Sequence, residues 1–236
     1  MYTETLTMPE SLDGSLVRSL ASKSLADELG TIADVVIDSA IESGALDGVP
    51  IIGMLVGGIK AGRDIRTNLF VRKVYLFLKE LSSLPADKRR HFAEQFDTDK
   101  ERHKFGETVL LLLERAEDMK KPQLIARIMS AHVLGELDLR QAMRLCSIID
   151  RCYTGDLEHL RGFRNGPQGA MTPIAESLFS AGLLSNGGLD GGSADGNDGG
   201  VIYCINEFGH MLLKHGLGEV NAEPPSPISV TLRARR

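Results

Sequence analysis

The feature that most constrains the fold of this chain is a close succession of helix signals between residues 67 and 154. Apolar side chains recur there at helical spacing, and most segments are bounded by a proline, a glycine or a residue that can cap a helix. The gaps between segments are short, which favours neighbouring helices that pack against one another. The run Leu110–Leu113 is apolar on several faces and predicts a central, buried helix. The predicted helices cover residues 67–81, 85–96, 97–119, 122–134 and 139–153.

Weaker signals precede this region. Residues 1–14 are mostly polar and show little periodicity, which predicts a disordered N-terminus. Between Ser15 and Ser43 apolar residues return at roughly helical spacing, and Gly30 and Gly44 divide them into two helices. Residues 15–154 therefore predict a helical bundle, and the predicted fold class is mainly α.

The composition favours a helical core and a reducing compartment. There is no Trp, and aromatic residues make up only 5% of the chain, so the core must be built mainly from aliphatic side chains and Met. Cys146, Cys152 and Cys204 are too few and too irregularly spaced for a disulfide framework. The sequence does not open with the basic-then-apolar pattern of a signal peptide. We therefore expect a cytoplasmic protein, with the inner face of the membrane as an alternative peripheral location.

The C-terminal third differs from the rest of the chain in composition and in its pattern of apolar residues. Thr172-Pro173 opens a short helix that Gly182 ends, and a strand is predicted in the β-branched segment "VIYCI". Residues 186–200 contain seven glycines and three aspartates, which predicts a flexible loop. Asn206 then caps a last helix. These features predict a small α+β module over residues 155–218, followed by a Pro-rich, Arg-ended tail over 219–236.

"LFSAGLL" followed by "IYCINEFGHMLL" resembles the end of many small bacterial winged-helix modules. The resemblance covers about sixty residues, and it implies that two strands form a wing between two helices. Asn206 stands at a cap position where those modules more often have Thr, and both side chains can accept hydrogen bonds from first-turn amides. The central helices are loosely similar to uncharacterised bacterial helical proteins, among them abortive-infection and other phage-defence proteins.

The stretch "GVPIIGMLVGGIKAGRDIRTNLFVRK", which begins at Gly48, is the most unusual in the chain. Its glycines do not form a Walker A loop, because Ile59 stands where lysine is required and no hydroxyl follows. The uncharged run from Gly48 to Ile59 is too short to span a bilayer. Close helix packing is the preferred interpretation, and contact with a membrane surface is the alternative. The residues concerned are Gly53, Gly57, Gly58, Gly62, Ile52 and Leu55.

Charge is unevenly distributed along the chain. Residues 1–50 carry nine acidic and two basic side chains, whereas residues 60–104 carry twelve basic and seven acidic ones. The two segments can face each other in the fold, or the basic segment can meet nucleic acid or an anionic membrane. The candidate anion-contacting residues are Lys60, Arg63, Arg66, Arg72, Lys73, Arg233, Arg235 and Arg236.

Signatures of catalysis and of metal binding are weak. His103 and Glu107 share a helix face at four-residue spacing, as do His132 and Glu136, but such isolated pairs are usually found on a surface. No nucleophile elbow and no dinucleotide-binding fingerprint is present. We therefore assign no catalytic residue, no metal ligand and no cofactor, and no small-molecule substrate is evident.

These observations favour a non-enzymatic bacterial protein that acts through protein partners or self-association. The loose resemblance adds the expectation of an effector or accessory component of a phage-defence or stress-response system. The recognition-helix segment "PIAESLFSA" lacks Lys, Arg, Asn and Gln, which disfavours a DNA-binding regulator. That regulator is the first alternative, and a membrane-acting effector that uses residues 48–59 is the second.

Overall fold

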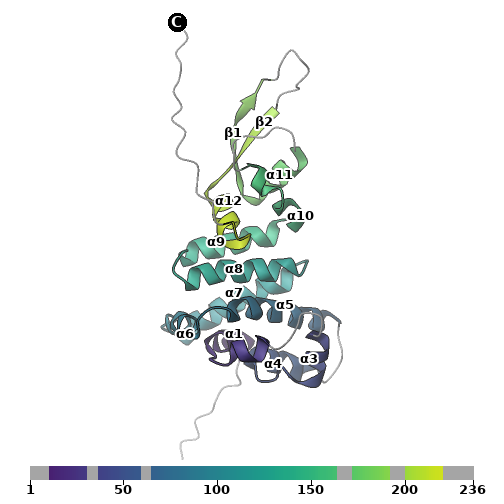
Figure 1. The fold of residues 1–236 in the computed structure, drawn as a ribbon, viewed down its shortest axis with the longest axis vertical. Coiled ribbons are helices and arrows are strands. Elements are labelled where there is room, and N and C mark those ends of the chain that lie inside the picture. The colour runs from purple at the N-terminus through teal and green to yellow at the C-terminus, as the bar shows by residue number, and fades with distance from the viewer. Residues whose placement is uncertain (1–10, 31–36, 60–64, 164–171, 192–199, 220–236) are drawn as a thin grey trace, which may run out of the picture. The chain divides into compact units, whose positions relative to one another are not determined.

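The computed structural model describes residues 11–30, 37–59, 65–163, 172–191 and 200–219. The chain divides into two compact units, residues 1–150 and 151–236, whereas the sequence predicted a boundary after residue 154. The fold is mainly helical with a small two-stranded sheet (Figure 1). The helices of the first unit are α1 (Leu12–Ala21), α2 (Leu25–Gly30), α3 (Ile37–Ser43), α4 (Pro50–Ile59), α5 (Ile65–Ser82), α6 (Ala86–Glu94), α7 (Asp99–Arg115), α8 (Lys120–Val133) and α9 (Leu139–Arg151).

Helix α1 occupies a central place in the first unit. It packs against α4, α6 and α7, and its side chains Leu16, Val17 and Leu20 are buried. Helix α5 packs against α2, α4, α7 and α8, and Figure 1 shows α5 between the α1–α4 side of this unit and α8. The aliphatic core expected from the composition is therefore arranged around two helices that are far apart in sequence.

Two expectations for the N-terminal region need correction. Helix α1 begins at Leu12, so residues 12–14 are helical although they were predicted to be disordered. The region predicted as two helices contains three, because a bend at Ser22–Ser24 separates α1 from α2. Ser22 has an extended backbone, and its amide donates to Ser19, which ends α1 before the predicted glycine. Residues 1–10 lie outside the described residues.

Helix ends in the middle of the chain follow local capping chemistry. Asp138 and Gln141 satisfy each other's backbone amides, with bonds of 2.8 and 3.0 Å, at the start of α9. Helix α7 is capped by Thr98, whose side chain accepts from the amide of Glu101. Gly135 adopts a positive φ of 79° after α8, as a helix-ending glycine commonly does.

The second unit contains α10 (Thr154–Leu157), a 3-10 helix (Leu160–Phe163), α11 (Thr172–Ala181), β1 (Leu184–Asp190), β2 (Gly200–Ile205), α12 (Glu207–Met211) and a π-helical turn (Leu212–Gly216). Strands β1 and β2 pair antiparallel, from Leu184 opposite Ile205 to Asp190 opposite Gly200. The side chain of Asn206 caps α12 by accepting from Gly209, and its amide also donates to the carbonyl oxygens of Gly182 and Leu184. A threonine could form the cap but could not replace this two-proton amide donor.

The sequence predicted that residues 186–200 form a flexible loop, and this prediction is wrong for part of the stretch. Residues 186–190 belong to β1, and Gly200 begins β2, while residues 192–199 lie outside the described residues. A bulge between Asn186 and Gly188 allows the pairing, and Gly188 adopts a positive φ of 125° there. Pairing with the β-branched residues of β2 thus outweighs the low strand propensity of the glycines in β1.

Candidate functional site

A cleft of about 730 Å³ lies in the first unit between α5, α7 and the start of α1. We call it the α5/α7 cleft. Its volume falls within the range of about 300–1,000 Å³ that is usual for binding pockets. The apolar residues that line it are Leu12, Leu69, Phe70, Leu110 and Leu111. The charged residues that line it are Asp13, Arg66, Lys73, Glu107 and Glu114.

The apolar lining results from the geometry of α7. Each residue of a helix is rotated by about 100° from the previous one, so four consecutive leucines cannot all face one core. Leu112 and Leu113 are buried, whereas Leu111 is 43% exposed and lines the cleft. Leu69 of α5 is 40% exposed in the same cleft. The prediction of a central, buried helix at Leu110–Leu113 therefore needs correction at Leu111.

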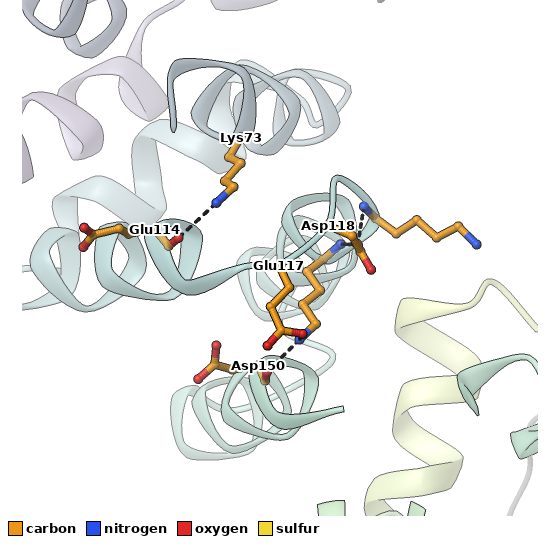
Figure 2. Close-up of polar contacts among 7 residues, drawn as sticks. Lys73, Glu114, Glu117, Asp118 and Asp150 are labelled. Carbon is orange, nitrogen blue, oxygen red and sulfur yellow. Dashed lines mark hydrogen bonds and ion pairs between the residues drawn. The ribbon is translucent and has the colours of Figure 1, made fainter. Parts of the chain in front are cut away.

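The two helices that form the cleft carry opposite charges. Arg66 and Lys73 come from α5, while Glu107 and Glu114 come from α7. Figure 2 shows Lys73 reaching toward the end of α7, where its Nζ donates a 3.0 Å hydrogen bond to the carbonyl oxygen of Glu114. Burial lowers the pKa of Lys73, and the carboxylate of Glu114 partly offsets this shift. The cleft is thus a polarised surface with a basic and an acidic wall.

Asp13 adds a carboxylate at the start of α1. Burial acts to raise the pKa of Asp13, but hydrogen bonds from Ser11 and from the first-turn amides, together with the charge of His103, lower it in total. Ser11 and His103 lie next to it, with 3.2 Å between Ser11 Oγ and His103 Nε2. The close approach of α1 to α7 produces this cluster, which favours the ionised form of Asp13.

The unusual glycine-containing segment forms α4. Ile52 is fully buried, Leu55 is 8% exposed, and the helix packs against α1 and α5. A Cβ atom at Gly53 would lie 2.9 Å from the carbonyl oxygen of Asp47, whereas one at Gly57 would meet nothing within 4 Å. Gly58 belongs to α4 as well. Among the described residues, no helix is long and apolar enough to cross a membrane.

The candidate anion-contacting residues are only partly brought together. Arg66 and Lys73 share the cleft, and Arg72 lies half-buried on the same helix. Another basic residue of the same segment, Arg89, is 2% exposed and is engaged by backbone carbonyl groups. Five of the candidate anion-contacting residues lie outside the described residues, namely Lys60, Arg63, Arg233, Arg235 and Arg236. Gly62, a candidate for helix packing, also lies outside them.

Glu107, Leu111 and Glu114 line the cleft although the sequence did not predict a site there. Their spacing of four and then three residues places them on one face of α7, and this was the available signal. The partner helix could not be inferred, because Leu69 and Lys73 lie some forty positions away. In the described part of the chain, no three His, Cys, Asp or Glu side chains are grouped so that they could hold a metal ion. Comparison with protein families, curated proteins and solved structures finds no match to this chain.

Proposed function

We propose that this protein acts through protein–protein contacts, and that the α5/α7 cleft binds a second copy of the chain. The observation that carries the proposal is the exposure of leucines between walls of opposite charge. Leu69 and Leu111 are 40% and 43% exposed in a cleft that also presents Arg66 and Glu107. Exposed apolar patches of this kind, rimmed by charged groups, are typical of interaction surfaces.

The charge arrangement favours a second copy over an unrelated partner. In a symmetric dimer the same patch is used by both subunits, so the patch must be complementary to itself. A two-fold axis through the cleft places the α5 wall of one copy against the α7 wall of the other. Arg66 then approaches the partner's acidic wall, and Glu107 approaches its basic wall. A surface of a single charge sign would repel its own copy.

Ile65 supplies a side chain that a partner can bury. It occupies the first position of α5 and is 76% exposed, one residue before Arg66 in the basic wall. Burying an isoleucine side chain completely stabilises an association by about 1.5–3 kcal/mol. The cleft has room for such a side chain. This apolar contribution complements the charge contacts, which mainly determine orientation and partner choice.

The two alternative functions receive less support. A DNA-binding surface needs basic side chains that are available to phosphates, but Arg89 is buried and Lys73 donates to a backbone carbonyl. A membrane-contacting α4 would have to expose Ile52 and Leu55, which pack inside the first unit. Both alternatives remain predictions, as does membership of a phage-defence or stress-response system.

Sedimentation equilibrium of the full chain at several concentrations tests the proposal. We expect a monomer–dimer equilibrium, and we expect Leu111→Asp to raise its dissociation constant by about tenfold or more. Leu134→Asp is the matched control, because Leu134 is 44% exposed but does not line the cleft. A chain that stays monomeric throughout, or a dimer equally sensitive to both substitutions, would overturn the proposal.

Charge reversal gives a second, sharper test. Arg66→Glu and Glu107→Arg each place like charges across the two-fold axis, so each variant alone should dimerise more weakly. A mixture of the two variants should recover association, because every wall then meets one of opposite sign. Failure of the mixture to associate better than either variant would exclude the two-fold arrangement, even if the wild-type chain dimerises.

A further inference from the structure

A second pocket in the first unit, of about 480 Å³, is separate from the α5/α7 cleft. We call it the aromatic pocket. It is lined by residues of α7, by the end of α6 and the turn after it, by α8 and by the start of α9. Its aromatic lining consists of Phe92, Phe96, Phe105 and His132. It shares no lining residue with the cleft, so the proposal below does not depend on dimerisation.

The four rings form one connected cluster. The ring centroid of Phe92 lies 5.3 Å from those of Phe96 and Phe105, and 5.5 Å from that of His132. Phe96 and Phe105 are 5.1 Å apart. Only 5% of the residues in the whole chain are aromatic, and three of the eight phenylalanines gather here. Phe92 and Phe105 are buried and Phe96 is half-buried, so these rings form an apolar lining that suits a flat or aliphatic molecule.

The polar groups of the lining include His132 and Thr108. His132 Nδ1 lies 2.9 Å from the carbonyl oxygen of Leu137, and because a carbonyl oxygen can only accept, Nδ1 carries the proton. Thr108 donates its hydroxyl proton to the carbonyl oxygen of Lys104 at 2.7 Å. Its oxygen can then offer only lone pairs to anything bound in the pocket.

Two carboxylates extend this acceptor character. Asp97 and Glu101 line the pocket at its exposed rim, and neither carboxylate has a hydrogen-bond or ion-pair partner among the residues that the structure describes. The donors in the lining are the exposed Gln95 and Lys104. Two carboxylates against one ammonium leave the lining with a net negative charge. A bound molecule that donates hydrogen bonds and carries a positive charge complements this lining best.

We infer that the aromatic pocket binds a small organic cation, with its apolar body against the phenylalanine rings and its ammonium or guanidinium group toward Asp97 and Glu101. The rings supply apolar contact for the body of the molecule, and the carboxylates supply charge-assisted hydrogen bonds to its cationic group. An anionic molecule of the same shape would meet two carboxylates. A neutral one would lose the charge contact while keeping the apolar burial.

Isothermal titration calorimetry of the full chain with 2-phenylethylammonium, 2-phenylethanol and phenylacetate tests the inference. These probes share the ring and differ in charge. We expect 2-phenylethylammonium to bind at least about tenfold more tightly than the other two. Equal affinity for all three, tighter binding of phenylacetate, or no binding of the cation at millimolar concentration would overturn the inference.

Substitutions localise the binding. Glu101→Gln and Asp97→Asn preserve shape and should each weaken binding of the cation, and together they should abolish its advantage over 2-phenylethanol. Glu94→Gln is the control, because Glu94 lies on the neighbouring helix α6 and does not line the pocket. Phe96→Leu keeps an apolar side chain but removes a ring against which the apolar body packs, so it should weaken the cation and the alcohol alike. An unchanged preference for the cation in the Asp97→Asn, Glu101→Gln double variant would contradict the assignment.

Discussion

Nη1 of Arg89 donates a 2.8 Å hydrogen bond to the carbonyl oxygen of Leu20, and this contact joins α6 to the C-terminal end of α1. The same nitrogen donates to Ser22 at 2.8 Å, and Nε donates to Leu84 at 3.2 Å. The last carbonyl groups of a helix have no partner within the helix, and burial denies them water. Burial also lowers the pKa of Arg89, although a guanidinium remains charged in proteins.

Replacing Arg89 by methionine should strongly destabilise the first unit. The substitution keeps an apolar stem but leaves the carbonyl groups of Leu20, Ser22 and Leu84 without this donor, at an expected cost of about 2–4 kcal/mol. Urea denaturation followed by circular dichroism measures the change. Arg90→Met is the control, since Arg90 is exposed and only pairs with Glu94 along α6, a contact worth less than about 1 kcal/mol. Similar effects of both substitutions would refute this account of Arg89.

Two helix glycines should respond to alanine in opposite directions. A Cβ atom at Gly106 of α7 would lie 2.2 Å from the carbonyl oxygen of Asp13, so Gly106→Ala must push α1 away and should cost about 1–3 kcal/mol. A Cβ atom at Gly57 of α4 meets nothing within 4 Å, so Gly57→Ala should stabilise the protein by about 0.5–1 kcal/mol through helix propensity. Thermal melting distinguishes the two. Destabilisation by Gly57→Ala would indicate a close neighbour of α4 that the structure does not describe.

Asn206 should be more sensitive to substitution than an ordinary helix cap. Its side chain accepts from Gly209 and donates to Gly182 and Leu184, so Asn206→Ala should lose about 2–3 kcal/mol. Asn206→Thr keeps an acceptor and should lose about half of that. Amide hydrogen exchange at Gly209 reports the cap directly. We expect fast exchange in the alanine variant and slow exchange in the threonine variant, and equal rates would rule out the cap as the dominant contact.

Thiol reactivity should separate the three cysteines. Cys146 and Cys152 are buried, whereas Cys204 is partly exposed. Burial raises the pKa of Cys146 far above its ordinary value of 9.0, so the folded protein keeps this thiol neutral and unreactive. Titration with a thiol-specific reagent should therefore modify Cys204 first and the other two only on unfolding. Labelling of Cys146 as fast as Cys204 would contradict the burial.

The raised pKa of Cys146 also predicts the direction in which the stability of the protein changes with pH. The pKa of Cys146 is higher in the folded chain than in the unfolded chain. Its contribution to stability is therefore complete below pH 9.0 and is lost as the pH rises further, because only the unfolded chain releases the proton. Cys146→Ala should remove this part of the alkaline loss. Urea denaturation midpoints at pH 8 and pH 10 in wild type and variant provide the measurement, and parallel losses would exclude a role for Cys146.

The long helices were predictable because their signals are local. The segment predicted over 67–81 is α5, and that predicted over 122–134 is α8, each within a few residues of the observed bounds. The mutual cap of Asp138 and Gln141 likewise depends on residues three positions apart. Strand β1 was not predicted from local propensity, because its pairing comes from β2 across the glycine-rich stretch, and only the winged-helix resemblance implied a second strand.

The candidate site was predictable only on its basic side. Arg66 and Lys73 were identified from the charge distribution, but their acidic counterparts lie on α7, some forty positions away. The exposure of Leu111 depends on which face of α7 meets α1 and α5, and a run of four leucines does not specify that face. The position of the acidic residues and the exposure of Leu111 are both determined by tertiary packing. No short segment of one sequence specifies that packing.

The central position of α1 has a consequence for folding during synthesis. Ser11 and His103, which meet where α1 packs against α7, are 92 positions apart in the chain. A nascent chain therefore emerges with the apolar face of α1 uncovered, and it cannot acquire this partner until α7 has left the ribosome. Closing so long a segment also slows folding, because the entropic cost comes before the contacts form. The interval before α1 can pack against α7 therefore depends on translation speed.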